Sequence, residues 1–232
     1  MAIFYEKELS KENNSLSEEE SRHCSQVLRH QEGDEIMIYD GNGGKHRANL
    51  TRVSKKVCDF KIIESNITPE KEFEIHLGIA PTKSIDRMEW LIEKLSEIGV
   101  DQVTFIQTKH SERKKIRLDR LEKKAVSAMK QSGNPFLMKI NELISIDQFL
   151  KNDSSDIKLI AHVDKTHQYI TKEVEPSKSI SVLIGPEGDF SIEEVNMAKA
   201  TGFKAVSIGE NTLRTETAGF VACCFVNTIN QY

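Results

Sequence analysis

The sequence predicts an α/β protein in two parts, a mostly β N-terminal region and a C-terminal region built on a parallel sheet. The first 68 residues contain short apolar strands separated by turn residues. From residue 73 onward, apolar strands alternate with helices whose apolar residues recur every three or four positions. Such alternation favours a parallel sheet with helices on both faces. The predicted domains are therefore residues 1–68 and 73–232.

The N-terminal region is predicted to contain three strands with a tight turn between the first two. The strands are expected at residues 36–39, 46–53 and 57–63. The turn is the Asp-Gly-Asn-Gly-Gly sequence at residues 40–44, whose glycines accept the positive φ angles of a hairpin turn. A linker is expected at residues 66–72, where the pattern changes.

One helix is predicted within this β region. Ser17 and Glu20 form a capping box that would open it. Arg22, Gln26 and Arg29 follow at helical spacing, so they would lie on one polar face. That face is either solvated helix surface or a surface that contacts phosphates.

The C-terminal region is predicted to alternate between strands and helices. Strands are expected at residues 73–80, 103–106, 157–161, 180–184 and 205–208, and helices at 86–98, 118–129, after 191, and 215–231. Ser191 and Glu194 form the capping box of the third of these helices. The last helix is apolar on nearly all sides, so one side would face its own sheet and another a second subunit.

Composition argues for a soluble, cytoplasmic protein without a metal site. The net charge is −4 with 29% charged residues, which excludes a globally basic nucleic-acid binder but leaves room for a local basic patch. No apolar run reaches the roughly 18 residues of a membrane span, and no signal peptide is expected. The four cysteines show no metal-binding spacing and are expected to be buried free thiols.

Two glycine-bearing loops near the C-terminus are predicted to hold one ligand between them. They lie in Val182-Leu-Ile-Gly-Pro-Glu-Gly-Asp-Phe190 and Ile208-Gly-Glu-Asn-Thr-Leu-Arg-Thr-Glu-Thr-Ala218. Each follows an apolar strand and leads into a helix, and ligands on open α/β sheets bind beyond the carboxyl ends of strands. Neither loop has a phosphate-binding pattern, and the carboxylate of Glu187 favours a cationic or hydroxyl-bearing ligand. Gly-Pro-Glu-Gly alone would also suit a plain turn.

These two motifs resemble the signature of the RsmE family of SPOUT-class RNA methyltransferases. Further segments resemble the same family: Val27-Leu-Arg29 with Gly33-Asp34, Asp86-Arg-Met-Glu-Trp90, Lys94-Leu-Ser-Glu-Ile-Gly99, Ser111-Glu-Arg113 and Gln131-Ser-Gly133. The resemblance covers nearly the whole chain. Asn134 stands where the family commonly has an arginine, and Asp189 where it often has a second glycine, which a loop tolerates if φ is negative.

The resemblance implies a fold, a reaction and partners. Residues 1–68 would be a PUA-like, RNA-binding β-barrel, and residues 73–232 a dimerising SPOUT domain with a trefoil knot. The activity would be methylation of N3 of a uridine in small-subunit (16S) ribosomal RNA, with S-adenosyl-L-methionine as cofactor and a homodimer as the active form. The cofactor-binding residues would be His162, Ile184, Gly185, Pro186, Glu187, Gly188, Ile208, Gly209, Leu213, Thr215 and Ala218.

Arg214 and Glu216 are the candidate catalytic residues. Arg214 has too high a pKa to accept a proton, so it would stabilise negative charge on the uracil oxygens as N3 deprotonates. Glu216 lies in the first turn of a helix, where the helix dipole favours an acid in any case, so catalysis and helix stabilisation are both open. The proton acceptor is left open and includes water. His162 ends a strand and either lines the pocket or is structural.

The candidate RNA-binding residues are basic side chains in both regions: Arg22, Arg29, Arg113, Lys114 and Lys115. A run of charge is either solvated surface or a set of phosphate contacts, and phosphate contacts position RNA rather than read its bases. Two other functions are considered, a non-catalytic RNA-binding assembly factor and a methyltransferase for a different RNA base. The intact glycine and arginine motifs argue against the assembly factor.

Overall fold

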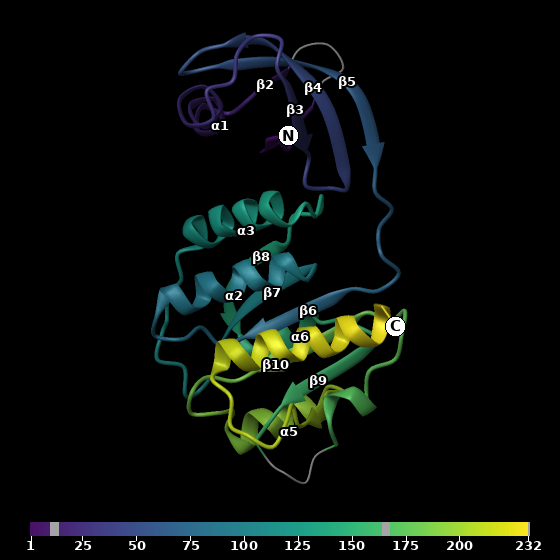
Figure 1. Cartoon of the computed structure of the whole chain (residues 1–232). Coiled ribbons are helices and arrows are strands. Elements are labelled where there is room, and N and C mark those ends of the chain that lie inside the picture. Colours follow the sequence, from purple (N-terminus) through teal and green to yellow (C-terminus); the bar gives the residue numbers. More distant parts are fainter. Residues whose placement is uncertain (10–13, 164–167, 232) are drawn as a thin grey trace. The chain divides into compact units, whose positions relative to one another are not determined.

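The structure, a computed structural model, describes residues 1–9, 14–163 and 168–231 of the chain. The chain divides into two compact units (Figure 1). The N-terminal unit comprises residues 1–70 together with 129–137, and the C-terminal unit comprises residues 71–128 and 138–232. The N-terminal unit thus contains a short segment from far along the sequence.

A five-stranded sheet forms the N-terminal unit, with the strand order β1-β3-β4-β5-β2. Its strands are β1 (Ile3–Tyr5), β2 (Asn14–Ser15), β3 (Glu35–Tyr39), β4 (Gly44–Val53) and β5 (Cys58–Ile67). Two register shifts between β4 and β5 bend this pair. Alternate side chains point inward, so that Ala48, Leu50 and Phe60 join Phe4 in one buried core. The three predicted strands are confirmed, while the short β1 and β2 lacked a readable pattern.

The turn at residues 40–44 holds the distant segment of this unit. Gly41 and Gly43 have φ angles of 80° and 94°, which confirms the expected need for glycine. The Gly43 N–H donates to the carbonyl of Pro135 (3.1 Å), and the Leu137 N–H donates to the carbonyl of Gly41 (2.9 Å). These backbone bonds explain why residues 129–137 group with the N-terminal unit.

The predicted polar face through Arg29 is wrong, because the helix does not continue in α form. α1 (Glu18–Arg22) passes into a π-helical turn, η1 (His23–Val27), and Arg29 then adopts a left-handed φ of 58°. Only half of the predicted capping box is present: the Ser17 hydroxyl accepts from the Glu20 N–H (3.3 Å), whereas the Ser17 N–H donates to the Glu6 carboxylate.

Six parallel strands form the sheet of the C-terminal unit, in the order β11-β9-β10-β6-β7-β8. The strands are β6 (Ile75–Ile79), β7 (Gln102–Gln107), β8 (Lys139–Ser145), β9 (Ile157–Ala161), β10 (Ile180–Ile184) and β11 (Lys204–Val206). The helical segments are α2 (Ile85–Glu97), α3 (Leu118–Ser132), α4 (Ile146–Asn152), η2 (Ile170–Lys172), α5 (Ile192–Ala200) and α6 (Thr215–Gln231). The parallel α/β prediction is confirmed; β8 and α4 were missed.

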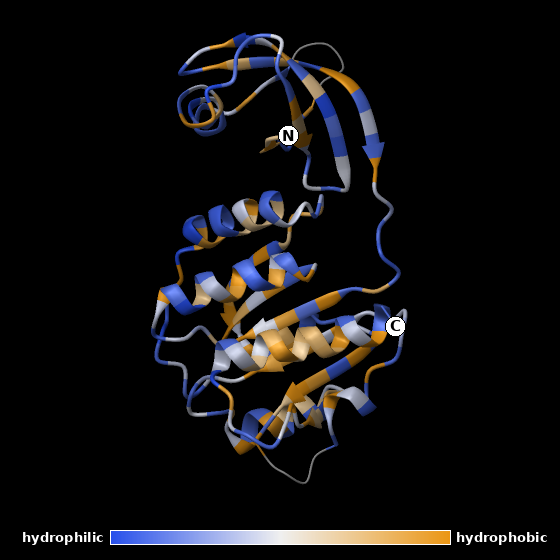
Figure 2. Ribbon diagram, in the orientation of Figure 1, coloured by the Kyte–Doolittle hydropathy of each residue, from blue (hydrophilic) through white to orange (hydrophobic). Residues whose placement is uncertain are grey.

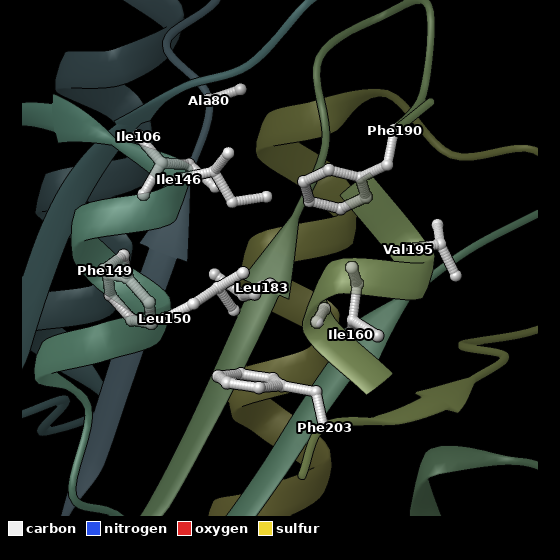
Figure 3. Packing of buried hydrophobic residues seen from close by; sticks show 11 residues of the cluster. Ala80, Ile106, Ile146, Phe149, Leu150, Ile160, Leu183, Phe190, Val195 and Phe203 are labelled. Atoms are coloured by element: carbon white, nitrogen blue, oxygen red, sulfur yellow. The ribbon is translucent and has the colours of Figure 1, made fainter. Parts of the chain in front are cut away.

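Helices cover both faces of this sheet, as predicted. On one face, Leu183 of β10 packs among side chains from α4, α5 and β9, including Phe149 and Ile160 (Figure 3). On the other face, α6 crosses the sheet (Figure 1), and Gly219 lies over Leu77 and Ile79 of β6. Position 219 has little room for a side chain, because an added Cβ would lie 3.0 Å from Ile79 Cδ1. α6 therefore packs closely on the strands beneath it.

The cysteines are free thiols, as predicted. Cys24, Cys58 and Cys223 are buried, and Cys224 is half-buried. Burial, together with the neighbouring Cys58, raises the pKa of Cys24 to about 12, so this thiol stays protonated at neutral pH. In the part of the chain that the structure describes, no helix has the length and apolar character needed to cross a membrane.

Candidate functional site

Three neighbouring strands end at the same level on one edge of the parallel sheet. Ala161 of β9 is the register partner of both Ile184 of β10 and Val206 of β11. The chain segments that follow these residues therefore begin side by side, at the carboxyl ends of the strands. This is the edge where open α/β sheets bind ligands.

A cavity of about 330 Å³ lies among these three segments, within the range typical of small-molecule sites. Its wall includes all the predicted cofactor-binding residues except Gly188: His162, Ile184, Gly185, Pro186, Glu187, Ile208, Gly209, Leu213, Thr215 and Ala218. Arg214 also lines it, and its side chain is exposed. The structure thus brings together the two loops that the sequence singled out, with the end of β9 as a third wall.

Gly188 faces away from the cavity, toward a loop that follows β7. His110 Nδ1 lies 3.1 Å from the Gly188 carbonyl oxygen and 2.9 Å from that of Asp189. A Cβ at Gly188 would lie 3.3 Å from His110 Cβ. Nearby, the Lys109 N–H donates to Glu194 Oε1 (2.7 Å), a side chain that belongs to the confirmed capping box of α5. These contacts brace the outer side of the glycine loop.

Asp189 has a φ of 58°, so the negative φ that would make this departure from the family pattern easy to tolerate is not present. Left-handed backbone is costly for most residues, but aspartate is among those that adopt it more readily. The Asp189 carboxylate accepts from the Phe190 N–H (2.7 Å) and from the Val163 N–H (3.2 Å). It also lies 3.5 Å from His162 Nε2. These contacts tie the loop after β10 to the end of β9.

Glu216 does not line the cavity. Its side chain is only 8% exposed, and Arg87 Nε of α2 lies 3.6 Å from its Oε1 atom, too far for a strong hydrogen bond. The other carboxylate oxygen, Oε2, has no hydrogen-bond partner among the described residues. Arg214 and Glu216, the two predicted catalytic residues, therefore point into different surroundings.

Several residues of the cavity wall were not predicted: Ala161, Val163, Asp189, Ser207, Glu210, Asn211 and Thr212. Most are immediate neighbours in sequence of predicted residues. The signal that would have found them is the rule that whole loops after adjacent parallel strands line such a site, rather than their glycines alone.

The predicted RNA-binding residues differ in how far they are engaged within the chain. Arg22 of the N-terminal unit forms an exposed pair with Glu18 (3.1 Å). In the C-terminal unit, the Arg113 guanidinium donates to the backbone carbonyls of Thr82 and Lys83, so it holds the loop after β6. Arg29, Lys114 and Lys115 are exposed.

No group of three or more His, Cys, Asp or Glu side chains suited to a metal ion occurs among residues 1–9, 14–163 and 168–231. The cavity combines backbone, apolar and charged groups. This combination suits an organic ligand that carries charge.

Two family models match the chain. Residues 69–227 match a model described as an RNA methyltransferase domain, and residues 16–63 match an RNA methyltransferase PUA domain. Together with the parallel sheet and the cavity at its strand ends, these matches place the chain in the RNA methyltransferase class.

Curated relatives and solved structures narrow the family. Ribosomal RNA small subunit methyltransferase E of Buchnera aphidicola is 30% identical, over 92% of this chain and 87% of the relative. A probable rRNA methyltransferase from Porphyromonas gingivalis is 38% identical with a TM-score of 0.93, over 100% and 99% of the two chains. Ribosomal RNA small subunit methyltransferase E of Neisseria gonorrhoeae, solved with bound S-adenosyl methionine, is 29% identical with a TM-score of 0.89, over 99% and 98%. The chain belongs to the RsmE family of RNA methyltransferases.

The contact between Arg87 and Glu216 leads to a stability prediction. In Arg87→Met, the buried Glu216 carboxylate loses its nearest cation, so we expect the free energy of unfolding at pH 7 to fall by about 1–3 kcal/mol. Urea unfolding followed by circular dichroism measures this change. Adding Glu216→Gln should restore much of the loss, because the buried group is then neutral.

The control is Lys151→Met, which removes a more exposed pair with Asp147. Surface pairs of this kind contribute about 0–1 kcal/mol. If Arg87→Met lowered the free energy of unfolding no more than this control does, the Arg87–Glu216 contact would stabilise the fold no more than a surface pair.

Proposed function

We propose that this protein uses S-adenosyl-L-methionine to methylate N3 of a uridine in small-subunit (16S) ribosomal RNA. The observation that carries the proposal is the cavity at the ends of β9, β10 and β11, in a chain whose family includes a relative solved with S-adenosyl methionine. In this proposal, residues 1–68 are the RNA-binding module and residues 73–232 the methyltransferase domain. Because the proposed substrate is ribosomal RNA, we also propose that the protein acts in the cytoplasm.

The residues of the cavity fit this cofactor. Gly209 lies in the wall, and among the described residues beyond its two chain neighbours no heavy atom lies within 4 Å of the place where its Cβ would be. Its φ is not left-handed, so neither packing nor backbone conformation requires a glycine there. An open glycine instead suits the close approach of a ligand to the backbone. We propose that the backbone at Gly185 and Gly209, with the side chain of Leu213, holds the cofactor.

Bound S-adenosyl-L-methionine supplies a methyl group on a positively charged sulfur, and the protein has mainly to align the uridine with that methyl group. We assign Arg214 to stabilise the negative charge that spreads over O2 and O4 as N3 loses its proton. Its exposed guanidinium lies in the cavity wall, where it can meet an incoming base. Of the two roles open to Glu216, its burial beside Arg87 favours stabilisation of the first turn of α6.

The proposal predicts that the purified protein binds S-adenosyl-L-methionine. In isothermal titration calorimetry we expect one site per chain in the wild type. Gly209→Ala should weaken binding about tenfold or more, because its methyl group meets the ligand. It should leave the melting temperature unchanged, because the described residues leave open space for that methyl group. A folded wild type without affinity for the cofactor would instead favour the assembly-factor function.

We also propose that basic side chains bind the phosphates of the RNA. Lys114 and Lys115 are exposed on the segment that precedes α3, and the other candidates from the charge pattern of the sequence are Arg22, Arg29 and Arg113. Because Arg113 donates to backbone carbonyls within the chain, substitution of the two lysines tests RNA binding with less disturbance of the fold.

Charge reversal of both lysines, Lys114→Glu with Lys115→Glu, should weaken binding to small-subunit RNA. In a plot of log K for binding against the logarithm of the salt concentration, the slope should become less negative by about 1 to 2. Fluorescence anisotropy over a salt series measures both effects. The matched control reverses Lys178 and Lys199, which are exposed lysines elsewhere in the C-terminal unit. An equal loss in both double variants would contradict a specific phosphate contact.

We further propose that the protein is a homodimer that pairs through the outer side of α6. The middle of the helix is apolar (Figure 2), and Val221, Cys224 and Phe225 on it remain only half-buried. Trp90 of α2 is 40% exposed, and its ring packs edge-on against the ring of Phe220, with 5.6 Å between the ring centroids. Exposed apolar surface of this kind marks an association face.

Sedimentation velocity at micromolar concentration tests the dimer. We expect a dimer for the wild type and a folded monomer for Val221→Asp, because a carboxylate in an apolar interface goes unpaired. Thr228→Asp, at an exposed polar position of the same helix, is the control and should remain dimeric. A monomeric wild type would overturn this proposal.

A further inference from the structure

The wall of the cavity carries more negative than positive charge. Among its described residues, Glu187, Asp189 and Glu210 are acidic, whereas Arg214 is the basic residue besides the titratable His162. Glu187 and Glu210 are exposed to water, which screens them. Asp189 is the acidic residue with a fixed position.

Four observations define that position. The left-handed φ of 58° sets the direction of the Asp189 side chain. The Phe190 N–H holds Oδ1 at 2.7 Å, and the Val163 N–H holds Oδ2 at 3.2 Å. The side chain is 25% exposed, so water screens it less than the other two carboxylates. A carboxylate held in this way places its negative charge at one point of the cavity wall.

The ligand changes its charge in the proposed reaction. The methyl group leaves the sulfonium sulfur and forms a bond to uridine N3, the N3 proton goes to solvent or to a base, and the bonding electron pair stays on sulfur. The cofactor therefore enters with a positively charged sulfur and leaves as a neutral thioether, S-adenosylhomocysteine. A fixed negative charge in the wall distinguishes these two forms, although they have nearly the same shape.

We propose that Asp189 makes the cavity select the positively charged methyl donor over its neutral demethylated product, and so assists product exchange. This inference rests on the proposed function. A fixed charge near a partly screened cation changes affinity by roughly tenfold, enough to matter when donor and product compete for one site.

The test compares the affinities of three ligands by isothermal titration calorimetry: S-adenosyl-L-methionine, S-adenosylhomocysteine and sinefungin. Sinefungin carries an amine in place of the sulfonium and keeps the positive charge without a transferable methyl group. The Asp189→Asn variant removes the charge but keeps an acceptor oxygen in the side chain. Asparagine also tolerates left-handed backbone. We expect about tenfold weaker binding of the two cationic ligands and less than threefold change for S-adenosylhomocysteine.

Two further variants complete the design. Asp189→Gly removes the charge and suits the left-handed backbone, so it should show the same loss of discrimination even if Asp189→Asn folds poorly. Glu193→Gln removes an exposed carboxylate of α5 outside the cavity wall and should leave the ratio of the three affinities unchanged.

If all three ligands weakened equally in both Asp189 variants, Asp189 would only hold the loop in place, and the inference would be overturned while the proposed function stood. A wild type that bound none of them would overturn the proposed function as well. Thermal melting of each variant without ligand separates these results from loss of fold.

Discussion

The common level at which three parallel strands end is the constraint on which the rest of the site depends. Ala161, Ile184 and Val206 share one register across β9, β10 and β11. Because the sheet fixes these positions, the segments that follow them must leave from one edge and enclose a common space. The cavity thus follows from hydrogen-bond register, and its glycines, carboxylates and arginine are additions to a space that the sheet already defines.

The loops around that space are fixed by contacts behind them. His110 and the Lys109 N–H brace the loop after β10 from outside, and Asp189 ties it to the end of β9. The segment after β11 leads directly into α6, whose first turn contains the buried Glu216 beside Arg87. Because these contacts already order the loops, a ligand loses less of its binding free energy to ordering them.

Much of this arrangement is readable in the sequence. Apolar runs before Gly185 and Gly209 indicate buried strands, and the Ser191 capping box marks the start of a helix, so the two glycine loops and their edge of the sheet are predictable. β8 is an edge strand with half-buried and exposed residues, which weakens its pattern. The left-handed φ of Arg29 and Asp189 is invisible because neither is glycine, and the threading of a knot, which stays a prediction, has no local signature. The grouping of residues 129–137 with the N-terminal unit depends on long-range backbone bonds that no local pattern reports.

Mass spectrometry of small-subunit ribosomal RNA from a strain that lacks the gene tests the central claim most directly. The account predicts that one N3-methyluridine disappears on deletion, returns with the wild-type chain and does not return with a folded Arg214→Ala chain that still binds S-adenosyl-L-methionine. An unchanged set of modifications after deletion, or full restoration by Arg214→Ala, would contradict it.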